Sequence, residues 1–286
     1  AIYSQYPDAE LHPVDEYLDM VGSVLPNKAY DLWGAELILG KESPYPIRTY
    51  PLFEEKTPEA LLDSISVITE IMSKLKEGEM ILIQLLIRPA NSDWVKEGQE
   101  IRDKFLSRDK AKSKPFLGAD LVRNLLSAPF APPTWEGEKK EERTPLSMLL
   151  LSPGEKDIVE GIERKIAKLG FESLIRFIFI DNRESFTPAY ISGIFGAFHL
   201  YNTQNMNFIR PISKTMTRVN KGFFKKKRLY LLKRRLFDRY WERRLPEKYA
   251  LKQAPIKSSV FNVEELATVF HFPSIAVESP ALHHVP

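Results

Sequence analysis

Residues 172–181, with the sequence ESLIRFIFID, give the clearest indication of the fold class. The run is apolar, rich in isoleucine and phenylalanine, and too short for a stable buried helix, so we expect a β-strand. A helix should precede it, because Ser152 and Glu155 have capping-box spacing and Pro153 suits the first helical turn. Gly170 is a suitable C-terminal end for that helix. The face that this helix should bury carries Ile158, Ile162, Ile166 and Leu169.

The same order of patterns occurs in the first half of the chain. Residues 57–78 begin with a threonine–proline pair and end at a glycine, and residues 80–88 (MILIQLLIR) follow at strand length. Helices should come next at 91–107 and, in the second half, at 188–202. We interpret this parallel as an internal duplication of a helix–strand–helix unit. The alternative is two unrelated segments of similar pattern.

Together these patterns predict an α+β protein with two ferredoxin-like α/β layers and a long basic amphipathic helix. Further strands are expected at 35–39, 47–51, 147–151 and 257–262. The expected organisation is a first α/β unit at 1–108, a charged, proline-containing linker or insertion at 109–144, a second α/β unit at 145–213, the basic helix at 214–250, and a closing strand, short helix and tail at 251–286.

Composition indicates a globular protein and excludes several classes of site. Of the 286 residues, 43% are hydrophobic, which is enough for a sizeable core, and there is no cysteine. Disulfides and thiolate-based metal or catalytic sites are therefore excluded. No apolar run reaches the roughly 20 residues that span a bilayer. Because the chain begins at Ala1 in a polar stretch, we expect it to be part of a longer protein, whose other parts could hold a membrane anchor or a catalytic module.

No motif of an active site is present. The sequence has no complete phosphate-binding loop, no dinucleotide fingerprint and no nucleophile elbow, and its five histidines form no zinc-binding spacing. Glu265 has a structural role instead, because Asn262 precedes it by three residues, as in a capping box for a short helix at 263–270. We therefore expect no enzyme activity, no cofactor and no metal.

The basic charge is concentrated in one part of the chain. Residues 214–244 hold 13 lysines and arginines against Asp238 and Glu242, a local net charge of +11 that leaves −8 for the remainder of a chain whose net charge is +3. A helix here would place Leu229, Leu232, Leu236, Tyr240 and Leu245 on one face. The residues expected to contact a polyanion or partner are Lys225, Lys226, Lys227, Arg228, Lys233, Arg234, Arg235 and Arg239.

Three interpretations of this basic helix stay open. It could dock on the sheet with its charges simply solvated. It could bind anionic lipid headgroups, because lysine and arginine beside aromatic residues are typical of the membrane interface. It could also contact DNA or an acidic partner protein, where its cations would neutralise phosphates or carboxylates.

Seven stretches carry a resemblance to a known family. They are 3–11 (YSQYPDAEL), 41–50 (KESPYPIRTY), 73–89 (SKLKEGEMILIQLLIRP), 160–172 (EGIERKIAKLGFE), 194–207 (IFGAFHLYNTQNMN), 223–240 (FFKKKRLYLLKRRLFDRY) and 261–273 (FNVEELATVFHFP). As a set they resemble an uncharacterised domain of conjugative, type IV secretion-like proteins of candidate-phyla bacteria. The last stretch also resembles a signature near the nucleotide-binding domain of HerA-like and conjugative ATPases.

The resemblance implies an accessory or assembly domain in a membrane-associated DNA-transfer system. Its partners would be a secretion or conjugation ATPase module or sister subunits, with an anionic membrane surface, DNA or a homo-oligomer as further candidates. It implies a cytoplasmic location at the inner face of the membrane, reached through sequence outside this chain. A direct DNA-binding module is the alternative function. The family brings no catalytic residues to these positions.

Overall fold

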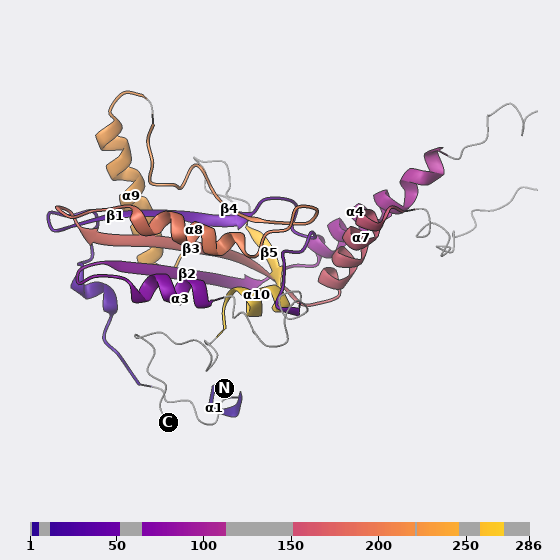
Figure 1. Ribbon diagram of the computed structural model, residues 1–286, viewed down its shortest axis with the longest axis horizontal. Coiled ribbons are helices and arrows are strands. Elements are labelled where there is room, and N and C mark those ends of the chain that lie inside the picture. The colour runs from indigo at the N-terminus through magenta and orange to yellow at the C-terminus, as the bar shows by residue number, and fades with distance from the viewer. Residues whose placement is uncertain are drawn as a thin grey trace, which may run out of the picture.

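The structure, a computed structural model, describes residues 2–5, 12–51, 65–112, 151–220, 222–245 and 258–271. Within them, five strands form one antiparallel sheet (Figure 1). They are β1 (Tyr30–Leu39), β2 (Met80–Pro89), β3 (Gly170–Asn182), β4 (Ile209–Pro211) and β5 (Ser259–Asn262). The order is β2-β3-β1-β4, with β5 also paired to β3. β3 is therefore the central strand, with β2 along one edge and both β1 and β5 along the other.

The strand β3 is buried on both faces, which explains its continuous apolar sequence. Phe177 and Phe179 pack on one face beneath α3 (Ser66–Ser73) and α8 (Ala189–His199). Ile178 and Ile180 alternate with them and pack on the other face, against α9 (Lys225–Trp241) and the short 3-10 helix η1 (Tyr17–Met20). The sheet is thus covered by helices on both sides.

Two further helices form an arm at the end of the sheet where β3 begins (Figure 1). They are α4 (Asp93–Lys112) and α7 (Pro153–Ile166), which pack against each other. The predicted capping box of α7 is present, with Ser152 and Glu155 bonded reciprocally. Its buried face differs from the prediction, because Val159 is buried with Ile162 while Leu169 is exposed.

Gly170 was predicted to end the helix, but it has a different role. It is the first residue of β3, and a Cβ at this position would lie 2.4 Å from the ring of Trp94. The glycine therefore lets the tryptophan of α4 approach the start of the central strand.

Most predicted elements are found, but the strand predicted at 47–51 is not, and within the described residues the basic helix predicted at 214–250 is limited to α9 (Lys225–Trp241). Strands β1, β2, β3 and β5 cover or overlap the predicted runs at 35–39, 80–88, 172–181 and 257–262. Helices α3, α4, α8 and α10 (Val263–Val269) overlap those predicted at 57–78, 91–107, 188–202 and 263–270. Residues 47–50, however, are irregular, because the Ile47 N–H donates to Glu265 and the Arg48 N–H to the Tyr201 carbonyl. The predicted helix start at Thr57 and the strand residues 147–150 lie outside the described residues.

The α+β class is confirmed, but the described residues form one sheet where two ferredoxin-like layers were expected. The strands β1 and β2, from the first half, pair with opposite edges of β3, from the second. Because β3 hydrogen-bonds along both of its edges, strands from the two halves belong to one sheet. The unit boundaries at 1–108, 109–144 and 145–213 stay predictions.

Gly34 allows helix α9 to pack closely on the sheet. A Cβ at this position of β1 would lie 2.5 Å from the Phe177 carbonyl oxygen and 2.6 Å from a methyl carbon of Leu236. Both contacts are shorter than real side chains allow, and the carbonyl cannot easily move because it belongs to the central strand.

We predict that Gly34→Ala lowers the free energy of unfolding by about 1–3 kcal/mol, because the added methyl overpacks the contact between β1 and α9. Urea denaturation measures the change. Gly196→Ala is the matched control, since a Cβ there meets nothing within 4 Å and alanine favours the helix. Equal stability of the two variants would contradict the close packing.

Candidate partner-binding surface on helix α9

The second half of α9 is fixed to the sheet by apolar packing. Leu236, Phe237 and Tyr240 are buried against Leu32 and Ile178. The Tyr240 hydroxyl also lies 2.8 Å from that of Tyr17 on η1. Burial and this hydrogen bond raise the pKa of Tyr240 above its ordinary value, so the ring stays neutral.

A buried arginine on β3 adds a polar clamp at the end of α9. Arg176 lies between Glu36 on β1 and Gln84 on β2 in the sheet register, and it donates two hydrogen bonds to Glu36 Oε1, at 2.8 and 3.1 Å. It donates another to Gln84 at 2.6 Å, and one each to the carbonyls of Arg239 and Arg244, both at 2.9 Å. A cation is favourable at these carbonyls, because the C-terminal end of a helix carries partial negative charge.

The charge state of this clamp follows from opposing effects. Burial lowers the pKa of the Arg176 guanidinium, and the carboxylate of Glu36 opposes that shift. An arginine remains protonated at neutral pH even so. The clamp is therefore an ion pair, and both side chains are fully buried.

Lys233, Arg234 and Arg239, from the predicted contact residues, each lie close to an acid of this chain. Lys233 is buried, lies 2.7 Å from Asp31, and sits above the ring of Phe186 at 5.4 Å. Arg239 lies 3.4 Å from Glu36, and Arg234 lies 2.9 Å from Asp238 one turn further along α9. A partner could use Lys233 or Arg239 only by competing with pairs that join α9 to β1, whereas the pair of Arg234 lies within the helix itself.

The other five predicted residues are exposed. Lys225, Lys226, Lys227 and Arg228 form the first turn of α9, and Arg235 lies further along the helix. In Figure 1 the first half of α9 stands clear of the sheet, whereas the second half lies against it near β1. The structure thus brings four cations together at a projecting helix end.

Two phenylalanines at the same end were not among the predicted contact residues. Phe223 and Phe224 directly precede the helix and are 89% and 80% exposed. In the sequence the pair is part of the FFKKKR run, where it could be taken for part of the apolar face of the basic helix. We call Phe223, Phe224, Lys225, Lys226, Lys227 and Arg228 the basic tip.

A second candidate site is a cavity of about 310 Å³ between α7, α10 and residues 46–49. Its floor contains the fully buried pair Lys165 and Glu265, 2.9 Å apart. Burial lowers the pKa of Lys165, and the carboxylate of Glu265 opposes the shift.

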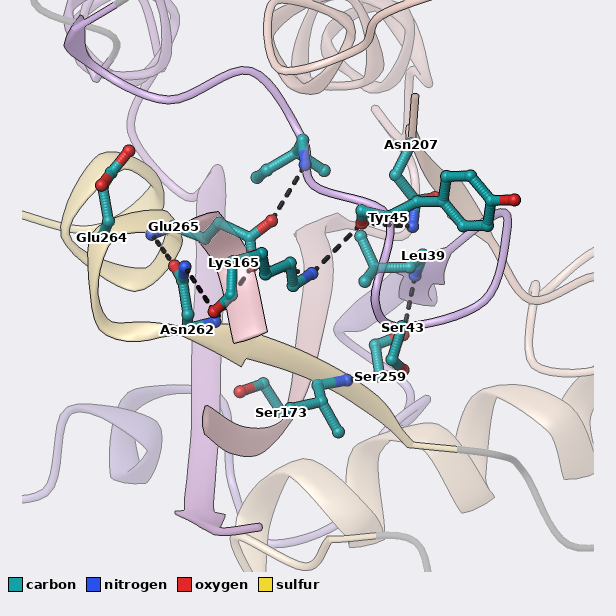
Figure 2. A network of polar contacts seen from close by, with 12 residues as sticks. Leu39, Ser43, Tyr45, Lys165, Ser173, Asn207, Ser259, Asn262, Glu264 and Glu265 are labelled. Atoms are coloured by element: carbon teal, nitrogen blue, oxygen red, sulfur yellow. Dashed lines mark hydrogen bonds and ion pairs between the residues drawn. The ribbon is translucent and has the colours of Figure 1, made fainter. Parts of the chain in front are cut away.

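The buried pair is committed to structural contacts (Figure 2). Glu265 accepts hydrogen bonds from the backbone N–H groups of Ile47 and Asn262, which completes the predicted capping box of α10. Lys165 donates to the Tyr45 carbonyl at 3.2 Å. At the rim, Glu264 bonds Thr49 at 2.5 Å and pairs with Lys168. These polar groups join α7, α10 and the irregular segment to one another.

Two features of the described residues bear on the kind of site. Among them, no three histidine or acidic side chains are grouped so as to hold a metal ion. No helix in the same ranges is both long and apolar enough to cross a membrane.

Comparison with known families places the whole sequence in a single family. Residues 1–284 match the family described as domain of unknown function (DUF8128), and the chain belongs to that family. No curated protein and no solved structure matches the chain.

The clamp makes a testable contribution to stability. We predict that Arg176→Met lowers the free energy of unfolding by about 3–5 kcal/mol, because Glu36 is left buried without its main partner. The double variant Arg176→Met/Glu36→Leu should be more stable than the sum of the single effects by on the order of 2 kcal/mol, since neither charge is then stranded. Chemical denaturation of the four proteins measures this coupling, and strictly additive effects would contradict it.

Proposed function

We propose that this chain is a non-catalytic assembly domain that contacts an anionic surface through its basic tip. The observation that carries the proposal is the division of α9 into two halves. One half is held on the sheet by apolar packing, by hydrogen bonds from buried Arg176 and by the Lys233–Asp31 pair, and the other presents four exposed cations. Such a helix can transmit a contact at its tip directly to the folded domain.

The position of the cations supports a role outside folding. The N-terminal end of a helix carries partial positive charge, so acidic residues are favourable there and cations are unfavourable. The first turn of α9 has no acidic residue and consists of three lysines and an arginine. Its like charges also repel one another. An anionic partner would relieve both effects.

The buried Lys165–Glu265 pair supports the non-catalytic part of the proposal. A catalytic lysine or carboxylate has to reach a substrate, whereas both of these side chains are fully buried and bonded to backbone groups. The cavity above them is then a gap between three segments that the pair holds together.

The proposed setting follows from the sequence resemblance. We place the domain at the inner face of the membrane in a conjugation or type IV secretion-like ATPase system, with an ATPase module, sister subunits or further copies of this chain as neighbours. The anionic surface would be the membrane itself. Lysines near an anionic leaflet each contribute about 1 kcal/mol to binding, so the tip has sufficient charge for a weak, salt-sensitive contact.

Direct binding of DNA is the second candidate, and the same four cations favour it. Consecutive lysines and arginines can neutralise several phosphates, and binding would then weaken steeply with salt. The two candidates differ in the surface that the partner must provide, because duplex DNA exposes phosphates but no accessible apolar layer.

The charge requirement is testable by reversal. We predict that Lys225→Glu/Lys226→Glu/Lys227→Glu weakens binding to vesicles of phosphatidylserine and phosphatidylcholine by at least about 100-fold, through loss of roughly 1 kcal/mol per lysine and added repulsion. Vesicle co-sedimentation at two salt concentrations measures this. The fold should be unaffected, since the three side chains are exposed.

The matched control is Lys76→Glu/Lys96→Glu/Lys104→Glu, which changes the net charge equally at exposed positions outside α9. It should retain vesicle binding within a few-fold. Binding of duplex DNA in place of vesicles, lost on reversing the tip, would favour the second candidate. The proposal fails if the wild-type chain binds neither, or if both triple variants behave alike.

A further inference from the structure

The basic tip has an apolar part that charge binding does not explain. Phe223 and Phe224 are adjacent in sequence, and both rings are almost fully exposed. Single exposed apolar residues are common on protein surfaces, but two neighbouring phenylalanines expose an unusually large apolar area. This area directly adjoins Lys225, Lys226 and Lys227.

The backbone at this point is held in an unfavourable conformation. Phe224 has φ of 56°, in the left-handed region that costs about 1–2 kcal/mol for a residue with a side chain. Gly222, two residues earlier, has φ of 111°, which glycine adopts readily. Inside a protein, burial of the ring would normally compensate such a cost. Here the ring lies in solvent, so the fold gains no burial from the turn.

The combination of exposed aromatic rings and adjacent cations is complementary to one kind of surface. At the boundary of a bilayer, phenylalanine rings enter the apolar layer while lysine and arginine remain at the headgroups, where anionic lipids attract them. Duplex DNA would satisfy the cations and leave the rings in water. A bilayer with anionic lipids satisfies both.

The geometry of α9 allows the rings to reach such a surface. Leu236 is the first fully buried apolar residue of the helix, and Lys225 lies eleven residues before it. At about 1.5 Å per residue the tip therefore stands roughly 16 Å beyond that packing contact. The opposite end is held by Arg176, so insertion would not require α9 to leave the sheet.

We infer that Phe223 and Phe224 insert into the apolar boundary of an anionic bilayer while Lys225, Lys226, Lys227 and Arg228 contact the lipid headgroups. This inference rests on the proposed function, in which the basic tip contacts an anionic membrane surface, and it adds that the two rings enter the apolar layer. The strained turn at Phe224 presents the rings beyond the first helical turn.

The test separates the rings from the charges. Phe223→Ser/Phe224→Ser keeps all four cations and removes the apolar area, and Phe223→Leu/Phe224→Leu keeps an apolar area without aromatic rings. The serine variant should bind phosphatidylserine-containing vesicles at least about ten-fold more weakly than wild type, and the leucine variant within about three-fold of it. Binding of both variants to heparin, a polyanion with no apolar layer, should stay within about two-fold of wild type.

Each outcome either supports or overturns the insertion of the two rings. Vesicle binding by the serine variant equal to wild type overturns insertion and leaves the charge-based function standing. Loss of binding to single-stranded DNA, with vesicle binding unchanged, also overturns insertion and indicates that the rings stack on bases. If wild type binds heparin but no anionic vesicle, the membrane is the wrong surface. If wild type binds neither heparin nor vesicles, the proposed function itself fails.

Discussion

The fully buried ion pair between Arg176 and Glu36 is the interaction on which the arrangement of sheet and helix depends. The guanidinium makes five hydrogen bonds, which is all that an arginine can donate. They join β1, β2 and β3 to the last turn of α9. Removing two charges from water costs several kcal/mol per ion, and the five hydrogen bonds offset this cost for the guanidinium, whereas Glu36 Oε2 is buried without a hydrogen-bond partner among the described residues. The pair therefore tolerates one geometry, and this fixes where α9 meets the sheet.

A second buried pair, Lys165 and Glu265, joins separate elements in a similar way near the other end of the sheet. It ties α7 and α10 to the irregular segment around Ile47, where backbone N–H groups would otherwise lack partners. Lys233 is also paired, with Asp31. Several charged residues that the sequence alone would place at the surface therefore make ion pairs within the fold. Four exposed cations are adjacent in sequence where α9 projects from the sheet.

The sequence predicted the structural features that depend on residues close to one another in the chain. The capping boxes at Ser152 and Asn262 were found because their partners lie three residues away, and β3 was found because its apolar run is continuous. Contacts between residues far apart in the sequence could not be predicted from it. Ile47 bonds Glu265, 218 positions later, so its segment needs no strand partner. Lys233 reaches Asp31 across 202 positions, and nothing local distinguishes it from exposed Lys227.

The most direct test places a probe at the tip. The chain has no cysteine, so Phe223→Cys provides a single thiol for an environment-sensitive fluorophore. A probe at Leu169→Cys, also an exposed apolar position but at the start of β3, is the reference. Addition of phosphatidylserine-containing vesicles should shift the emission at position 223 to shorter wavelength and raise its intensity, with no change at 169. Emission at 223 that stays typical of water while the protein is vesicle-bound, or a shift at 169 instead, would contradict the account.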